Sequence, residues 1–185
     1  MQVNTEQVNT QKMLEHNRMK ERSVHGSLQR TMTNVVLNNI DFRESTILNC
    51  QDFSQSKLEG LFTGSIVTSD ADAQLLVKIK FREKVDCSQI KFCPLPESLE
   101  SQKPRTVKLF VNKNEMDFGD VDTMVSATVI EFPFENADFT QSLAGAKFTR
   151  IQSLQIFVEV NFGTDQTCLG PIQIDGFISP SYHTQ

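Results

Sequence analysis

The chain has 185 residues, with 14 Phe, one Tyr and no Trp, and a formal net charge of −5. This length fits one domain with an extension and is sufficient to bury a core without disulfides or metals. The acidic balance argues against nucleic acid as a partner. Membrane insertion is not expected either, because no run approaches the about 18 apolar residues of a membrane span.

Residues 1–36 contain no Phe and are rich in Asn, Gln and Thr, which predicts a polar N-terminal arm ahead of a compact domain. Thr10 to Arg22 contains good helix formers and no Gly or Pro, so the arm is expected to be partly helical. Its thin apolar stripe cannot fold alone, so we expect a partner to order it; a solvated tail is the alternative. The candidate docking residues are Met13, Leu14, Arg18, Met19, Lys20 and Arg22.

After Ile40 the sequence changes to short apolar segments with a period of two, which is typical of half-buried strands. The clearest strands are predicted at Gln74–Phe81, Thr106–Asn112 and Ser153–Val160, and less regular ones at Val85–Phe92, Val125–Phe132 and Ile172–Ile178. One face of the clear strands carries Leu75, Val77, Ile79, Phe81, Val107, Leu109, Val111, Leu154, Ile156, Val158 and Val160. The core is expected to include Leu75, Val77, Ile79, Val107, Leu109, Leu154, Ile156 and Val158.

Helical periodicity is nearly absent between residues 40 and 180, which argues against a parallel sheet with crossover helices. We therefore predict an all-β fold, an antiparallel β-sandwich or jelly roll. It should span residues 37–179 and be followed by a short tail of residues 180–185.

Three blocks of the sequence resemble the PITH family and occur in the family's order. Ser69 to Ile79 resembles a signature in which an Asp-rich turn opens the first long strand. The stretch PRTVKLFVNKNEMDFGD from Pro104 resembles a strand that ends in Asn before a Met-Asp-Phe turn. Phe148 to Asn161, FTRIQSLQIFVEVN, resembles the third block, and a weaker opening lies at Ile40.

The PITH domain follows thioredoxin in proteasome-associated thioredoxin-like proteins, and this sequence resembles a stand-alone form because it has no Cys-Gly-Pro-Cys centre. The resemblance implies a galactose-binding-domain-like sandwich and a non-catalytic adaptor that docks onto protein subunits of a large intracellular assembly. The 26S proteasome is the first candidate, and a ciliary or cytoskeletal complex is the second. The expected location is the cytoplasm, with the nucleus open, and a cilium or axoneme is the alternative.

A sandwich that binds a carbohydrate or another small molecule is the rival function, since the jelly-roll scaffold serves both roles. The lack of Trp and the single Tyr weaken it, because sugars usually stack on these rings. An enzyme comes third, with no catalytic residue and no cofactor expected. His16, His25 and His183 all lie in the predicted tails, which removes most triad and zinc chemistry from the domain.

Four cysteines, Cys50, Cys87, Cys93 and Cys168, are scattered without a C-x-x-C spacing, so we expect free thiols, several of them buried. Possible calcium ligands in two turns are Asp117, Asp120 and Asp122, and Asp70 and Asp72, but their spacing does not match an EF-hand loop. The simpler role of acidic turn residues is to accept backbone N–H bonds, so no metal site is expected.

Loops presented by a rigid sandwich are the favoured place for recognition. Residues 69–73, 115–122 and 161–166 are expected at one rim, where their acidic side chains would suit a basic protein surface; a solvated rim is the alternative. The candidate partner-binding residues are Ser69, Asp70, Asp72, Met116, Asp117, Asp120, Asp122, Asn161 and Asp165.

Overall fold

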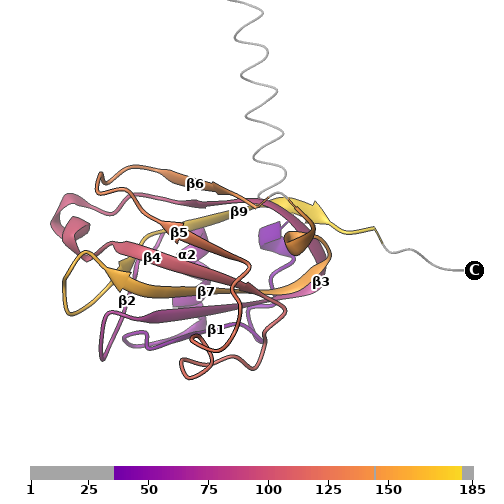
Figure 1. Cartoon of the computed structure of the whole chain (residues 1–185), viewed down its shortest axis with the longest axis horizontal. Coiled ribbons are helices and arrows are strands. Elements are labelled where there is room, and N and C mark those ends of the chain that lie inside the picture. The colour runs from indigo at the N-terminus through magenta and orange to yellow at the C-terminus, as the bar shows by residue number, and fades with distance from the viewer. Residues whose placement is uncertain (1–35, 144, 181–185) are drawn as a thin grey trace, which may run out of the picture.

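The computed structural model describes residues 36–143 and 145–180 as a mostly antiparallel β structure (Figure 1). The candidate docking residues of the arm, Met13 to Arg22, lie outside the described residues. Val36, the last residue of the predicted arm, is fully buried in the core. The packed domain therefore includes at least this residue of the predicted arm.

One layer of the sandwich has the strand order β1-β3-β7-β4-β5, with every pair antiparallel. Its strands are β1 (Thr46–Leu48), β3 (Leu75–Phe92), β4 (Pro104–Val111), β5 (Thr128–Glu131) and β7 (Ile151–Asn161). The second half of β3 pairs with β6 (Phe139–Ser142) and β9 (Ile172–Ile178), and these strands build the other layer. A separate ladder joins β2 (Val67–Thr68) to β8 (Cys168–Leu169).

Strand β3 passes from one layer into the other, so it joins two strands that the sequence predicted separately. Its pairing with β7 shifts register between Lys80 and Val85, and the polar residues 82–84 at this corner are exposed. A bulge bends a strand and increases its twist, which allows the ladder to continue on both sides of the bend. The polar residues that interrupt the apolar pattern therefore mark a bend within one strand and not a loop between two strands.

The alternating residues of β3, β4 and β7 fill the space between the layers, as predicted. Each of the following side chains is at most 1% exposed: Leu75, Val77, Ile79, Phe81, Val107, Leu109, Leu154, Ile156 and Val158. Ile90, Ile172 and Ile174 of the other layer belong to the same apolar cluster. This core confirms the predicted fold class and the predicted inward face of these strands.

Val160 is a correction to the predicted strand face, because the period of two places it on the face of Ile156 and Val158, whereas it is 42% exposed. Thr106 pairs with Val160 while the next residue, Val107, pairs with Val158, so Glu159 is an extra residue in β7. An extra residue reverses the side-chain alternation beyond it. The bulge turns Val160 outward and Asn161, which is 7% exposed, inward.

A helix that the sequence analysis did not predict, α2 (Gln55–Thr63), packs near β1, β2 and β9. It lies behind the layer of β4 and β7 in Figure 1. The side chain of Ser54 caps it by accepting a bond from Lys57 N, and Gly64 ends it with φ of 132°. Two short 3₁₀ helices, η1 (Glu97–Gln102) and η2 (Ala146–Phe148), complete the connections. Strand β5 is shorter than predicted, and Val125 is exposed ahead of it.

Candidate functional site

Two of the three predicted binding loops, 69–73 and 161–166, meet at one rim of the sandwich. Ser69 N donates to Thr167 O at 2.9 Å, and Thr167 N donates to Ser69 Oγ at 2.8 Å. The side chain of Gln166 reaches the other loop and donates to Asp70 O at 3.2 Å. The rim that these loops form is therefore a single hydrogen-bonded unit.

Asn161 shapes its own loop and does not point to solvent. Its Nδ2 donates to Thr164 O and Gln166 O, each at 2.9 Å, and its Oδ1 accepts from Gly163 N at 2.9 Å. With the side chain 7% exposed and its amide occupied, Asn161 satisfies backbone groups that the turn leaves unpaired.

Asn49 performs the same task for the 69–73 loop, and the sequence analysis missed it. Its Nδ2 donates to Asp72 Oδ1 at 2.9 Å and to Gln74 O at 2.7 Å, while its Oδ1 accepts from Ala71 N at 2.9 Å. Its backbone φ is 59°, a left-handed conformation that Asn tolerates better than most residues. The sequence signal that could have predicted this turn is the Asn directly after the short strand β1, because Asn favours turns.

The third loop, 115–122, does not share this rim, which corrects the predicted grouping. Pro104 at the start of β4 pairs with Asn161, whereas Asn112 after the end of β4 lies beside Ser153, so this connection leaves from the opposite end of the strand. It then folds over the outer face of the sheet, where its residues bury a second apolar cluster: Leu76, Phe110, Met116, Val121 and Phe157.

The nine predicted binding residues separate by burial. Ser69, Met116 and Asn161 are buried in the packing of their own loops, so their side chains do not face a partner. Asp120 is half-buried, and the exposed candidates are Asp70, Asp72, Asp117, Asp122 and Asp165. Binding through these exposed carboxylates stays a prediction.

The acidic loop uses two of its carboxylates to build turns. Asp117 Oδ1 accepts from Gly119 N at 2.8 Å, and Asp120 Oδ2 accepts from Asp117 N at 3.0 Å. Among residues 36–143 and 145–180, no group of three or more His, Cys, Asp or Glu side chains could hold a metal ion. These bonds fit the turn-forming role of the acidic residues.

The four cysteines are free thiols. Burial raises the pKa of Cys87 from 9.0 to about 12, with the charge of Asp86 acting in the same direction. Burial also raises the pKa of Cys50 and of Cys93, in each case against the lowering effect of a nearby lysine. A nucleophilic cysteine needs the opposite shift, so these three thiols do not provide one.

A polar hollow with a volume of about 420 Å³ lies outside the rim. It is lined by Glu44, Thr46, Lys78, Ile79, Lys80, Asn114, Glu115 and Gln155, with no aromatic ring among them. An apolar pocket of about 30 Å³ lies between residues 92–95 and 132–139 and holds no more than a water-sized group. The polar hollow therefore lacks the aromatic platform typical of sugar sites. The apolar pocket is lined by Phe92, Phe132 and Phe139 but is too small for a sugar ring.

No helix in the described part of the chain is long and apolar enough to cross a membrane. Comparison with protein families gives a match to the PITH domain model over residues 27–184. Thioredoxin-like protein 1 of Schizosaccharomyces pombe is 35% identical over 107 residues, which are 56% of this chain and 37% of that protein. The PITH domain-containing protein GA19395 of Drosophila pseudoobscura pseudoobscura is 26% identical over 117 residues, 63% of this chain and 54% of that protein.

The chain thus spans between about a third and about half of the length of these relatives. Among solved structures, the module CpGH89CBM32-5 of Clostridium perfringens, in complex with GalNAc-β-1,3-galactose, superposes with a TM-score of 0.56 and 7% identity. It covers 76% of this chain and 98% of the module. The family 32 module of C. perfringens NanJ, in complex with galactose, gives 0.55 and 7% identity, with coverage of 76% and 96%. At such identity the likeness shows the jelly-roll fold alone.

Proposed function

This chain belongs to the PITH domain family, and on that premise we propose that it is a non-catalytic interaction module that docks into a large intracellular assembly. The observation that carries the proposal is the family match over residues 27–184, together with the similarity to a thioredoxin-like protein. The assembly that the resemblance implies first is the 26S proteasome. The proposed location is accordingly the cytoplasm, with the nucleus open.

The chemistry of the described residues supports a binding role over a catalytic one. All three histidines of the sequence, His16, His25 and His183, fall outside the described ranges. Burial raises the pKa of the Cys50, Cys87 and Cys93 thiols, which disfavours the thiolate. General acid–base and nucleophilic catalysis rest on such groups, so the sandwich offers them little.

Co-sedimentation of the full-length chain with purified 26S proteasomes tests this proposal. We expect the wild-type chain to sediment with the particles. We expect weaker binding when residues 1–26 are deleted or when Arg18, Lys20 and Arg22 are reversed in charge. Deleting residues 1–26 leaves the family match from residue 27 intact and spares Val36, a buried core residue that deletion of residues 1–36 would remove.

The truncated chain should unfold at nearly the wild-type temperature, because the arm is proposed to dock and not to belong to the domain. Unfolding of this variant at a much lower temperature would assign the arm to the fold. Absence of co-sedimentation at low and physiological salt would reject the proteasome, and isolated ciliary axonemes would then test the second candidate. Binding to neither particle would contradict both assemblies named for this chain.

A further inference from the structure

Phe134, Phe162 and Lys103 form an aromatic rim cluster at the end of the sandwich where β5 and β7 terminate. Phe134 follows β5, Phe162 directly follows β7, and Lys103 directly precedes β4. The two rings meet edge to face, with centroids 5.6 Å apart and an interplanar angle of 86°. Lys103 Nζ lies 5.5 Å from the Phe134 centroid and 5.1 Å from the Phe162 centroid.

Phe134 is 75% exposed, yet three contacts hold it in place. Besides the edge-to-face contact and the ammonium near its ring, Lys103 Nζ donates a hydrogen bond to Phe134 O. Lys103 itself is only 7% exposed, although lysine is rarely buried in proteins. A buried cation is thus used to fix a phenylalanine that contributes little to the core, and a fixed aromatic side chain loses little entropy when it binds.

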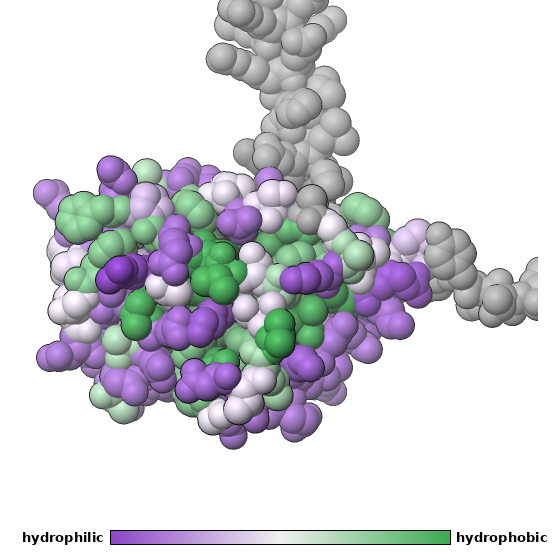
Figure 2. Space-filling view, viewed as in Figure 1, coloured by the Kyte–Doolittle hydropathy of each residue, from purple (hydrophilic) through white to green (hydrophobic). Residues whose placement is uncertain are grey.

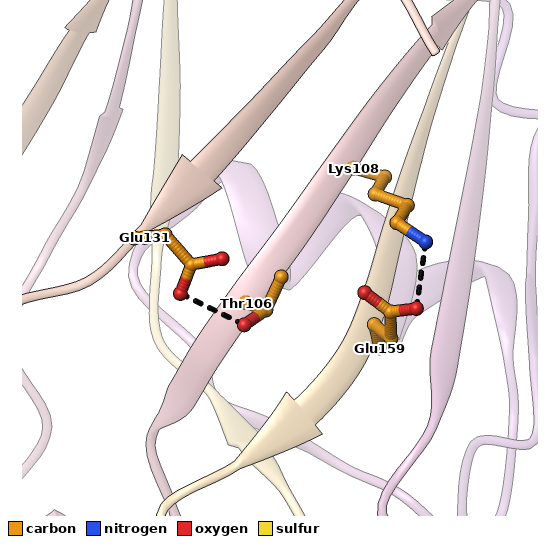
Figure 3. A network of polar contacts seen from close by, with 4 residues as sticks. All are labelled: Thr106, Lys108, Glu131 and Glu159. Carbon is orange, nitrogen blue, oxygen red and sulfur yellow. Dashed lines mark hydrogen bonds and ion pairs between the residues drawn. The ribbon is translucent and has the colours of Figure 1, made fainter. Parts of the chain in front are cut away.

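The adjoining sheet face continues the apolar surface of the cluster. Val129 on β5 and Val160 on β7 are 49% and 42% exposed. Two side chains of β4 bind carboxylates of these strands: Thr106 Oγ1 donates to Glu131 Oε2 of β5 at 2.9 Å, and Lys108 Nζ bonds Glu159 Oε1 of β7 at 2.6 Å (Figure 3). A partner that covers this face would cover Lys108 and Glu159 as an ion pair. The carboxylate of Glu131 is held by a neutral hydroxyl, keeps its negative charge and favours a partner that carries a cation.

Figure 2 looks onto this face and shows apolar side chains among hydrophilic ones, with apolar groups also at the left edge, where β5 and β7 end in Figure 1. The charges that flank the cluster are mostly negative. Glu135 follows Phe134 directly, Asp165 lies three residues after Phe162, and both are exposed; Arg105 is the exposed cation next to the start of β4. Such a surface complements an apolar segment that carries positive charge.

We propose that the aromatic rim cluster, with Phe134 as its anchor, is a docking surface for a partner protein segment that combines a small apolar pocket with flanking Lys or Arg. Lys103 is a positioning residue that holds the ring of Phe134. The proposal rests on the proposed function, since it names the surface and the partner chemistry of the same interaction module. Exposed aromatic anchors of this kind supply a large share of the binding energy in many interfaces.

Site-specific photocrosslinking in an extract of the native cells tests the surface. The full-length chain carries p-benzoylphenylalanine in place of Phe134 or, as the control, in place of Phe53, which is 38% exposed in the connection before α2. We expect a crosslinked protein at position 134 that excess wild-type chain competes away. The Phe134→Ser chain should need about tenfold or higher concentration to compete, whereas Phe53→Ser should compete like the wild type.

The crosslinked peptide, identified by mass spectrometry, should carry net positive charge and apolar residues. Phe134→Ser should melt at nearly the wild-type temperature, because the side chain is largely exposed, and this measurement excludes misfolding as the cause of weak competition. Equal competition by Phe134→Ser, or an acidic crosslinked peptide, would overturn the proposal.

A competed crosslink at position 53 and none at position 134 would move the surface while leaving the adaptor function in place. No competed crosslink at either position would overturn the surface. If, in addition, the full-length chain sediments with neither proteasomes nor axonemes, the proposed function itself fails.

Discussion

Ile156 lies at the centre of the described core, on β7 opposite Val77 of β3 and Leu109 of β4, and is fully buried. Ile156→Ala should therefore lower the free energy of unfolding by about 2–5 kcal/mol, through lost burial and the cavity left behind. Urea denaturation measures this change. Val160→Ala on the same strand is the matched control and should cost under about 1 kcal/mol, because Val160 is 42% exposed. A loss below about 1 kcal/mol at Ile156 would contradict the register of β7.

Cys87 should make stability fall at high pH. Its pKa is about 12 in the folded chain against 9.0 for an ordinary thiol. Because the folded pKa is raised, the stabilisation is complete below about pH 9 and is lost as the pH rises toward about 12. One such group contributes a slope of at most about 1.4 kcal/mol per pH unit in this range.

Denaturation of the wild type and of Cys87→Ala between pH 8 and pH 11 measures this effect as a difference. The difference cancels the titration of other groups, such as lysines. The stability advantage of the wild type should shrink as the pH rises. A constant difference between the two proteins would show that the Cys87 thiol titrates near its ordinary pKa when folded.

At individual positions, the sequence predicts inward-facing residues well and turn residues poorly. The alternation identified Leu154, Ile156 and Val158, because side-chain direction in a strand follows from a period of two. It failed at Val160, because an extra residue in the ladder changes direction without changing the apolar pattern. Asn161 looked like a recognition residue for a similar reason: polar loop residues that bind their own backbone and those that bind a partner have the same composition.

Helix α2 shows why a short element escapes prediction. It has nine residues, and its buried residues Leu58, Gly60, Leu61 and Phe62 occupy little more than one turn, so the helical period is hardly repeated. The available signals were its two ends: Ser54 before the first turn and Gly64 after the last. The packing of loop 115–122 onto the outer face of the sheet was also not predicted. Met116 and Val121 lie in a segment rich in Asp, and such a composition is typical of a solvated turn.

The cap of α2 offers a direct test at this scale. Ser54→Ala removes the oxygen that accepts the bond from Lys57 N, at 3.2 Å, and should lower the free energy of unfolding by about 0.5–2 kcal/mol. Gln55→Ala, at the exposed first helical residue, is the control and should stay within about 0.5 kcal/mol of the wild type. Thermal or chemical denaturation decides between them. Equal effects of the two changes would show that Ser54 does not act as a cap.

For the whole molecule, we expect stability to depend on packing, with neither metal nor internal disulfide required. The described cysteines are free, and the carboxylates of Asp117 and Asp120 are engaged in turns. The temperature of half-unfolding should therefore be unchanged by a chelator and by a reductant. A clear drop on chelation would restore the calcium hypothesis for Asp117, Asp120 and Asp122, and a drop on reduction would reveal a disulfide.

The passage of β3 through both layers has a consequence for synthesis on the ribosome. Its partners β6, β7 and β9 all follow it in the chain, and β9 ends only at Ile178. Among the described strands that pair with β3, only the short β1 precedes it. An emerging β3 therefore waits with most of its edges unpaired until most of the remaining chain has been translated, and loop closures of this length are slow. We infer that the nascent chain depends on chaperone cover over β3, and that a ribosome stalled before β7 is exposed holds an aggregation-prone strand.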